Sequence, residues 1–381
     1  MGFVLALGLV SLLADATYEG ARSVAGPYLA ILGAGAAAVS IVSGAGELLG
    51  YALRLLSGYW SDRLRSPWTL AFAGYGLNLL AVPCLALTGR WEVAAALLVL
   101  ERVGRGLRTP VRDAMLSHAA ARVGAGRAYG LHEALDQVGA VAGPLVVALV
   151  LALTASHRLS FAVLLLPAVG ALSALEWARR RFPHPRALEA DTAVAVDGAL
   201  PGRFWVYLAG VSLLAAGYAD FPLIAFHLRQ AEVLGPSAIP LVYALAMGVD
   251  AGAALLLGRG FDRIGVKVVA LAALTASLGV PLVFLGGVGA AVAGAMLWGV
   301  GMAAQESVLK AAIVGMTPVH RRGMIFGLFD AVHGVFWFLG SVALGLLYER
   351  SIPALVLLAT GLQVAAAAVF LLVSLRENRA S

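Results

Sequence analysis

Long apolar segments, separated by short polar stretches, repeat along almost the whole sequence. Each is close to or above the roughly 17–25 residues that an α-helix needs to cross a bilayer. They run approximately over residues 3–31, 38–56, 70–87, 92–116, 129–153, 159–177, 204–226, 239–257, 268–285, 288–314, 324–347 and 352–373. This pattern predicts an all-α membrane protein with twelve transmembrane helices.

One polar segment is longer than the others and divides the pattern in two. Residues 179–203 contain prolines and charges of both signs, as expected of a linker. We therefore expect an N-terminal six-helix half at 1–178, a cytoplasmic linker at 179–203 and a C-terminal six-helix half at 204–381.

The two halves also share short motifs in the same order. The motif that begins at Gly58 recurs at Gly258, an offset of 200 residues, with an Asp-Arg pair in both copies. Farther along, Gly143 recurs as Gly340 at an offset of 197 residues. Two similar six-helix bundles are typical of secondary transporters, whose substrate site lies between the bundles near the middle of the membrane.

Composition agrees with a membrane setting. The chain is 61% hydrophobic and only 13% charged, whereas a soluble domain has about 25% charged residues. The 45 glycines suit close helix packing in lipid. Cys84 is the single cysteine, which excludes an internal disulfide and a cysteine-based metal cage.

The distribution of Lys and Arg predicts the orientation. Seventeen of the 27 lie on even-numbered turns or near the C-terminus, and only four lie on the opposite side. Positive residues stay in the cytoplasm, so we expect both termini there and the protein in the cell (cytoplasmic, inner) membrane. Because the basic residues serve topology, nucleic acid is not an expected partner. The expected partners are the lipid bilayer and a small-molecule or ion substrate, bound by a monomer.

Charged residues inside the predicted helices are the strongest functional signal. A charge at the bilayer centre costs roughly 2.5–3.5 kcal/mol on insertion scales. In the fourth helix Glu101, Arg105, Arg108 and Arg112 follow steps of four, three and four, so they share one face. In the fifth helix Glu133 and Asp136 are three apart, and His132 is four before Asp136. These two faces are expected to meet each other, or water, along a polar transport path.

Similar residues occur in most of the other helices. The candidates for proton coupling and for the substrate cavity are Asp15, Glu19, Arg22, Glu47, Arg102, Arg105, Arg108, Glu133, Asp136, Asp220, His227, Asp250, Glu306, Lys310, Asp330 and His333. Glu306 and Lys310 are four apart, which suits an internal ion pair. The carboxylates favour a cationic substrate or protons, although the arginines and Lys310 could instead bind an anion.

With these residues in view, the chain resembles the major facilitator superfamily over essentially its full length. That family has the pattern G-x-L-a-D-R-x-G-R-K after its second helix. The first copy matches at Gly58, Asp62 and Arg63, but has Arg65 and Pro67 where Gly and Lys are expected. The second copy matches at Gly258, Asp262, Arg263, Gly265 and Lys267. An acid at a helix end can bind neighbouring N–H groups and arginines, so we expect these residues to form a conformational gate.

The fourth and fifth helices extend the resemblance. The family pattern R-x-x-q-G matches at Arg102 and Gly106, and the family's arginine is implicated in proton coupling. A buried guanidinium stays charged, so it can act only on a nearby acid. Proton-exchanging exporters carry G-(x)8-G-(x)3-G-P-(x)2-G-G in the fifth helix. The matching residues are Gly130, Gly139, Gly143 and Pro144, whereas Val147 and Ala148 replace the last pair.

The glycine pattern has two interpretations, and so do the acids near it. The glycines suit either a gate bent at Pro144 or close packing alone. We expect Glu133 and Asp136 to face Arg102 or Arg105 and to bind and release a proton in each cycle. The alternative is that both acids are permanent counter-ions of buried arginines.

Three functions compete at this point. The first is a secondary active transporter that works by alternating access and exports a small polar or cationic solute, with the proton as coupling ion. The second is a divalent metal exporter of the same fold, with ligands from His132, Asp136, His227 and His333. The third is a membrane enzyme or a receptor. Because no zinc-helix motif, nucleophile elbow or phosphate loop occurs, we expect neither an enzyme nor a cofactor.

Overall fold

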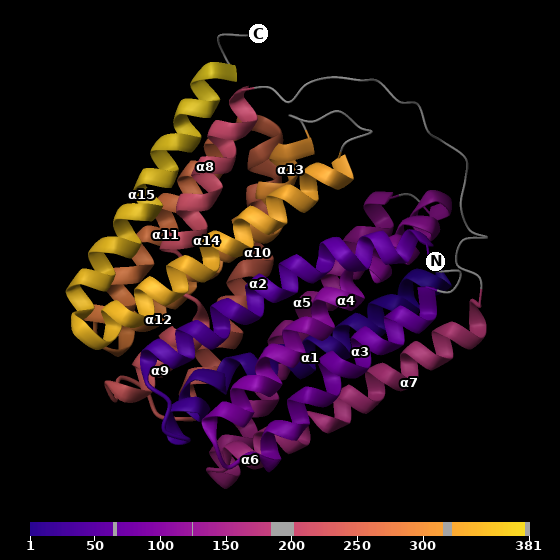
Figure 1. Ribbon diagram of the computed structural model, residues 1–381, viewed down its shortest axis with the longest axis horizontal. Coiled ribbons are helices and arrows are strands. Elements are labelled where there is room, and N and C mark those ends of the chain that lie inside the picture. Colours follow the sequence, from indigo (N-terminus) through magenta and orange to yellow (C-terminus); the bar gives the residue numbers. More distant parts are fainter. Residues whose placement is uncertain (64–66, 124, 184–201, 315–321, 378–381) are drawn as a thin grey trace. The chain divides into compact units, whose positions relative to one another are not determined.

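The computed structural model describes residues 1–63, 67–123, 125–183, 202–314 and 322–377 (Figure 1). Helices account for almost all of these residues, and no strand occurs among them. Eleven helical segments are long and apolar enough to cross a membrane. The twelfth predicted span is α4 (Trp91–Val123), which has 33 residues but also carries the row of charges. The structure therefore confirms the all-α membrane fold and agrees with twelve spans.

The chain forms two series of helices. Before residue 184 come α1 (Gly2–Ile31), α2 (Ala36–Arg63), α3 (Pro67–Cys84), the 3-10 turn η1 (Leu85–Leu87), α4, α5 (Ala125–Thr154), α6 (His157–Val163) and α7 (Leu165–Arg181). After residue 201 come α8 (Gly202–Gly217), α9 (Phe221–Gln230), α10 (Ala238–Ile264), α11 (Lys267–Leu285), α12 (Val288–Ala303), the π-helical turn η3 (Ala304–Val308), α13 (Leu309–Val314), α14 (Arg322–Arg350) and α15 (Ile352–Glu377). Most of the expected linker, residues 184–201, lies outside the described part of the chain.

The helices cluster into two compact units. Unit 1 contains residues 1–34, 45–193 and 235–244, and unit 2 contains residues 35–44, 194–234 and 245–381. The start of α2 thus packs with unit 2, and the start of α10 packs with unit 1. The domain boundaries expected at residues 178 and 204 stay a prediction.

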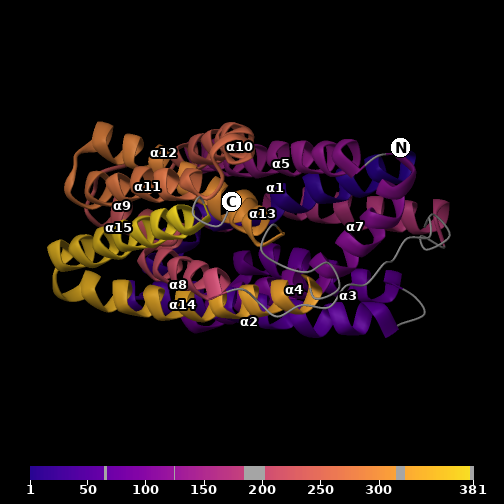
Figure 2. The same cartoon turned by 90° about the horizontal axis from the view of Figure 1, so that it is seen from above.

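In unit 1, α1 occupies the centre. It packs along α5 and also contacts α7 and α4, while α3 packs on α4 and α7 (Figures 1 and 2). The buried cluster between these helices includes Leu7, Leu79, Met115 and Leu175. Because α1 has neighbours on several sides, nearly all its side chains are buried, including its charged ones.

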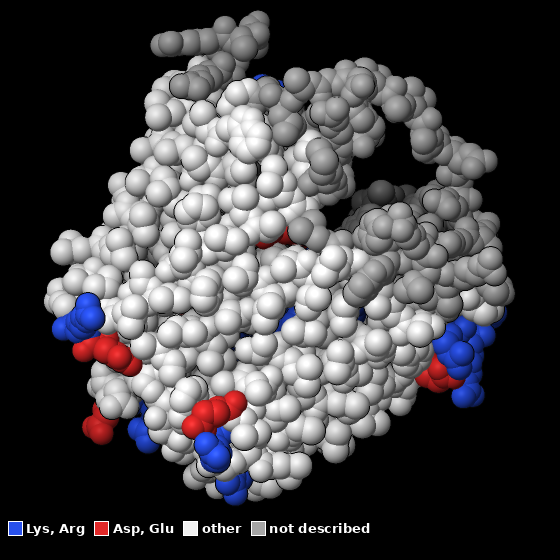
Figure 3. All heavy atoms as spheres, viewed as in Figure 1, with Lys and Arg blue, Asp and Glu red and all other residues white. Residues whose placement is uncertain are grey.

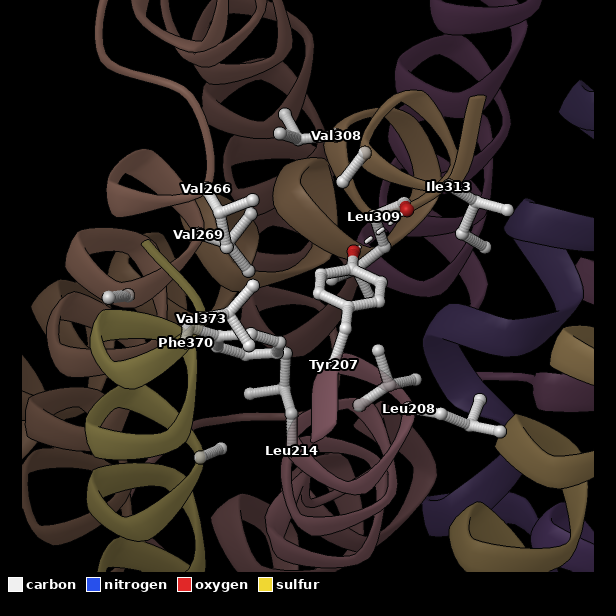
Figure 4. Packing of buried hydrophobic residues seen from close by; sticks show 14 of the residues in the cluster. Tyr207, Leu208, Leu214, Val266, Val269, Val308, Leu309, Ile313, Phe370 and Val373 are labelled. Atoms are coloured by element: carbon white, nitrogen blue, oxygen red, sulfur yellow. Dashed lines mark hydrogen bonds between the residues drawn. The ribbon is translucent and has the colours of Figure 1, made fainter. Parts of the chain in front are cut away.

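In unit 2, α8 has the central place. It packs against α14 and α15, and α11 packs on α12 and α15. Figure 4 shows the apolar cluster that joins these helices, with Tyr207 and Phe370 at ring centroids 5.5 Å apart. The Tyr207 hydroxyl donates a hydrogen bond to the Leu309 carbonyl at 2.8 Å, so a buried polar group is satisfied within an apolar core.

The two units repeat one scheme of packing. The contacts α1–α5, α3–α4, α1–α7 and α3–α7 have the counterparts α8–α14, α11–α12, α8–α15 and α11–α15. A close approach of two helices at a glycine also occurs in both units. A Cβ added to Gly143 would meet the Ala16 carbonyl, and one added to Gly340 would meet the Ala216 carbonyl. These paired contacts agree with the predicted pseudo-symmetry of the two bundles.

The surface also has the character of a membrane protein. Large apolar side chains such as Leu153, Leu166, Leu256 and Leu357 are mostly exposed. On the face that Figure 3 shows, uncharged atoms cover most of the described surface, and charged atoms gather near helix ends. Lipid is the solvent that such a surface requires.

Candidate functional site: a charged network in unit 1

Four charged side chains of α1, α2 and α4 form a chain of ion pairs. The Glu47 carboxylate lies 3.3 Å from Nη1 of Arg102 and 4.0 Å from Nη2 of Arg22. Arg22 in turn lies 3.9 Å from Glu19, three residues earlier on α1. All four are buried. Each charge therefore has an opposite charge close by, as a low-dielectric surrounding requires.

The chain of ion pairs continues along α4 to α3. Glu101 lies 3.3 Å from Nε of Arg102. The Asn78 side chain on α3 donates to the Glu101 carboxylate at 2.6 Å and to its backbone carbonyl at 3.1 Å. A Cβ added to Gly104 would meet the backbone of Asn78. This close approach of α3 and α4 brings the amide within reach of the acid.

Arg108 is deeply buried, with a side chain that is 1% exposed. Its Nη2 lies 3.8 Å from the Asp15 carboxylate. The guanidinium also lies over the ring of Tyr75 at 4.6 Å and farther from that of Tyr18, at 5.5 Å. Arg105 lies over the same Tyr18 ring at 4.5 Å. Cation–π contacts thus supplement a single carboxylate.

A second cluster joins α4, α5 and α1. Arg112 lies 3.5 Å from Asp136, and its Nη1 donates to the Ser11 hydroxyl at 3.3 Å. The His132 ring lies 3.3 Å from the same hydroxyl and 3.7 Å from Asp136. Arg112 also pairs with Asp113 at 2.9 Å. The arginine therefore has two carboxylates, one buried and one half-exposed.

Glu133 differs from the expectation. Its side chain is exposed, and its carboxylate accepts a hydrogen bond from Gln137 at 3.3 Å on the same helix. His132, Asp136, Gly139 and Gly143 follow steps of four, three and four, and their face of α5 is turned to α1. Residues three apart differ by about 60° around a helix, so Glu133 lies beside this face. Asp136 contacts Arg112 and not the expected Arg102 or Arg105.

The glycines of α5 make the close contact between α5 and α1. Added Cβ atoms would meet the carbonyl of Leu12 at Gly139 and the carbonyl of Ala16 at Gly143. One added to Gly130 would meet nothing within 4 Å, so Gly130 has no part in this packing. α5 continues through Pro144 to Thr154. Gly139 and Gly143 therefore allow close packing on α1, while the choice between packing alone and a gate bent at Pro144 stays a prediction.

The expected gate residues lie at the ends of α2 and α10. Gly58, Asp62 and Arg63 belong to the last turns of α2, and their side chains are outside the described part. In the second copy, α10 ends at Ile264 and Gly265 follows with φ +61. Its N–H donates to the Phe261 carbonyl at 2.8 Å, as expected of a glycine that ends a helix.

Near Gly265, the other residues of the second motif copy make few close contacts. Asp262 and Arg263 are exposed, and an added Cβ at Gly258 would meet nothing within 4 Å. Lys267 begins α11. The turn geometry fits the motif, while the gating role of these side chains stays a prediction.

In unit 2 the acids occupy separate places. Asp220 begins α9, where its Oδ1 accepts from the Phe221 N–H at 2.8 Å, and the Ser43 hydroxyl donates to its Oδ2. Asp250 is 1% exposed in the middle of α10. Asp220 therefore has a structural task, which is to cap the helix that starts after the break between α8 and α9.

His227 lies on α9, and the other remaining candidates of unit 2 lie on the α12–η3–α13 span and on α14. Lys310 lies 3.9 Å from Asp330, and His333 lies 3.2 Å from the Gln305 side chain. Glu306 is exposed within the π-helical turn. A π turn widens the helix, which changes the register that the four-residue spacing to Lys310 assumed.

Comparison with known proteins identifies the family. The family model of the Major Facilitator Superfamily matches residues 7–267. The chain belongs to this superfamily. It is 41% identical over 372 residues to an uncharacterized protein of Mycobacterium tuberculosis strain H37Rv, covering 96% of this chain and 91% of that protein. An uncharacterized MFS-type transporter of Methanocaldococcus jannaschii is 31% identical over 137 residues, 36% of this chain and 34% of that one.

Solved structures agree at the level of the fold. The nucleoside transporter NupG superposes with a TM-score of 0.77 at 15% identity, covering 98% of this chain and 99% of that one. The peptide transporter POT, in complex with sulfate, gives 0.80 at 14% identity, with 99% and 95% covered. Because the family model matches residues 7–267, the chain is a secondary transporter of this superfamily and not an enzyme.

The four residues of the alternative metal set lie on three helices: His132 and Asp136 on α5, His227 on α9 and His333 on α14. Across the described residues, no group of three or more His, Cys, Asp or Glu could hold a metal ion. His132 and Asp136 are neighbours, but His227 lies 3.1 Å from the Tyr348 hydroxyl and His333 faces Gln305.

Several residues of the transporter's network escaped the sequence reasoning. Tyr18, Tyr75 and Asn78 contact the buried charges, and Tyr243 at the start of α10 donates its hydroxyl to Glu19. Neutral polar residues in apolar helices have no regular spacing from which their role could be predicted. The available signal was Asn78, an amide in the middle of a predicted span, where a hydrogen-bond partner is needed.

Proposed function

We propose that this transporter exchanges protons for a small polar or cationic solute by alternating access, and that it exports the solute. The observation that carries the proposal is the ion pair of the buried Asp136 with the half-buried Arg112, which lie 3.5 Å apart. Asp136 lies on the helix face that contacts α1, so a change in packing there also changes the surroundings of the acid.

A proton on Asp136 removes the charge that Arg112 faces. Arg112 then keeps Asp113 at 2.9 Å and Ser11 at 3.3 Å, so the guanidinium stays paired through both states. Loss of a buried counter-ion without such a substitute is strongly destabilising. The arrangement therefore allows proton binding and release at modest cost.

The cargo class follows from the remaining charges. In the described helices of unit 2, Asp220 and Asp250 are buried, and Asp330 is half-buried beside Lys310. In unit 1 arginines accompany the buried acids. Carboxylates in excess of bases favour a cationic cargo, which would compete with protons for them.

Export rests on the resemblance of Gly139, Gly143 and Pro144 to the pattern of proton-exchanging exporters. Orientation rests on the bias of Lys and Arg, which predicts cytoplasmic termini in the cell membrane. Single-cysteine labelling in a variant without Cys84 checks the orientation. A cysteine at exposed Glu232 should react with an impermeant reagent from outside, and one at Arg181 should not; the reverse result would invert the topology.

Transport in proteoliposomes with an imposed pH gradient tests the coupling. Asp136→Asn should lose uphill transport of cationic solutes but retain exchange of cargo for cargo, because the amide cannot release a proton. Glu133→Gln is the matched control, since it removes an exposed carboxylate three residues away on the same helix. If Asp136→Asn transports uphill at the wild-type rate, coupling lies elsewhere, and Asp15 with Glu19 is the next candidate pair.

A further inference from the structure

An open cavity of about 530 Å³ lies between α3 and α7 in unit 1, away from the charged network. Its lining includes Trp68, Phe72, Glu176, Arg179 and Arg180. α3 begins at Pro67 and α7 ends at Arg181, so the cavity lies where two membrane helices end. The volume is within the usual range for small-ligand sites, which is about 300–1,000 Å³.

One wall of the cavity is a cluster of aromatic rings. Trp68 contacts Phe3 edge-on with centroids 6.2 Å apart, and Phe3 lies 5.0 Å from Phe182. Trp68 is 4% exposed, and its indole N–H is buried with no hydrogen-bond acceptor among the described residues. Tryptophan at the membrane interface usually pairs its N–H with a polar group. A ligand with an acceptor oxygen would supply one.

Basic residues also line the cavity, and the Arg179 guanidinium lies over the Phe72 ring at 5.9 Å. Glu176 binds Nε and Nη2 of Arg179, both at 2.7 Å, and Nε of Arg180 at 2.6 Å. These bonds hold two guanidinium groups side by side and use only part of their five donors each. Arg181 follows at the end of α7, where its guanidinium lies over the Phe182 ring at 5.8 Å. Charged atoms gather at this end of α7 in Figure 3.

Farther along the two helices, toward the ends opposite to the cavity, the surface is apolar. Leu80 on α3 is 44% exposed and Val169 on α7 is 50% exposed. A basic rim, an aromatic wall and an apolar surface beyond them match the order of groups in a phospholipid. Basic pockets between transmembrane helices are known to suit anionic head groups.

We propose that this cavity binds the phosphate diester of an anionic phospholipid. Arg179 and Arg180 hold the phosphate oxygens with the donors that Glu176 leaves unused. The Trp68 N–H donates to a head-group oxygen, and the acyl chains lie along α3 and α7. The site is independent of the transport path, because none of its residues belongs to the charged network.

Lipid retention in nanodiscs tests the proposal. Wild-type protein is placed in phosphatidylcholine nanodiscs that contain a minor share of phosphatidylglycerol, re-extracted in mild detergent, and its bound lipid measured by mass spectrometry. We expect phosphatidylglycerol to be enriched over phosphatidylcholine. Arg180→Gln should lower this enrichment about fivefold, the usual contribution of one basic residue near an anionic surface, and Arg179→Gln with Arg180→Gln should abolish it. Trp68→Phe, which keeps a ring but removes the N–H, should lower it less.

The matched control is Arg90→Gln with Arg350→Gln. Arg90 also forms an exposed pair with a nearby acid, Glu92 at 3.3 Å, and the double change removes the same charge elsewhere. This control should retain the wild-type enrichment. Equal enrichment in the Arg179→Gln, Arg180→Gln protein would overturn the proposal. So would full competition by soluble inorganic phosphate, which would make the site one for a free anion. Arg180 is 77% exposed, so its single variant should fold and keep the test decisive.

Discussion

The α4 helix of unit 1 and its counterpart in unit 2, the span α12–η3–α13, share a packing role but differ in chemistry. Each packs against the helix before it, α3 in one case and α11 in the other. α4 is an unbroken helix of 33 residues with buried charges along one face. The counterpart carries only Glu306 and Lys310 as charges, and it contains a π-helical turn of five residues.

This difference shows that the scaffold is repeated while the charges are not. Backbone contacts such as those at Gly143 and Gly340 occur in both units. The arginine row and its acids occur in unit 1 alone among the described helices. Unit 1 should therefore depend on ion pairs for stability, and unit 2 on apolar packing such as that around Tyr207 and Phe370 (Figure 4).

Removal of Arg108 should have the largest effect. Arg108→Gln leaves the buried Asp15 carboxylate without its guanidinium, and breaking a buried pair costs about 3–5 kcal/mol. We expect a large loss of thermal stability in detergent, measured by unfolding-coupled fluorescence. Adding Asp15→Asn should recover much of the loss, because the unpaired charge then disappears. If the double variant is no more stable than Arg108→Gln, the ion pair is not the cause.

The glycine contacts should give the next effect, and here the units should behave alike. A Cβ in Gly143→Ala or Gly340→Ala would meet a carbonyl of the neighbouring helix. Overpacking typically costs about 1–3 kcal/mol, so both variants should unfold at lower temperature. Gly130→Ala is the control, since its Cβ enters open space. A loss in only one unit would show that the repeated contacts are not equivalent.

The same contrast explains what could be predicted from the sequence. The apolar spans, their repeat and the burial of charges could be predicted from the sequence. They follow from the free-energy cost of placing polar groups in lipid, which restricts the residues that a transmembrane helix can contain. The partners of individual side chains could not be predicted, because they depend on how each helix is rotated about its own axis. Asp136 and Glu133 are three residues apart, yet only Asp136 is buried. The partner of Lys310 on α14 depends on a π turn that no spacing indicates.

Substitution of Gly265 should have a smaller effect on stability. This glycine lies in a turn where the two motif copies differ in sequence, because the first copy has Arg65 there. Its φ of +61 lies in the left-handed region, where a side chain costs roughly 1–2 kcal/mol. Gly265→Ala should lower stability by about that much. Gly258→Ala, in the interior of the same helix and in open space, should instead be neutral or stabilise slightly. Gly265→Ala should therefore lower the unfolding temperature and Gly258→Ala should not, and an equal loss in both variants would contradict the turn argument.

Lys310 should have the smallest effect and completes the comparison with Arg108. Its side chain is 41% exposed, and its ammonium lies 3.9 Å from Asp330. A pair at this distance with an exposed lysine should be close to a surface ion pair, which contributes about 0–1 kcal/mol, because solvent and the freedom of the long side chain offset the attraction. Lys310→Gln should thus shift the unfolding temperature far less than Arg108→Gln, and Asp330→Asn should add little to it. A loss as large as that of Arg108→Gln would mean that unit 2 also depends on buried charge, and the contrast between the units would fail.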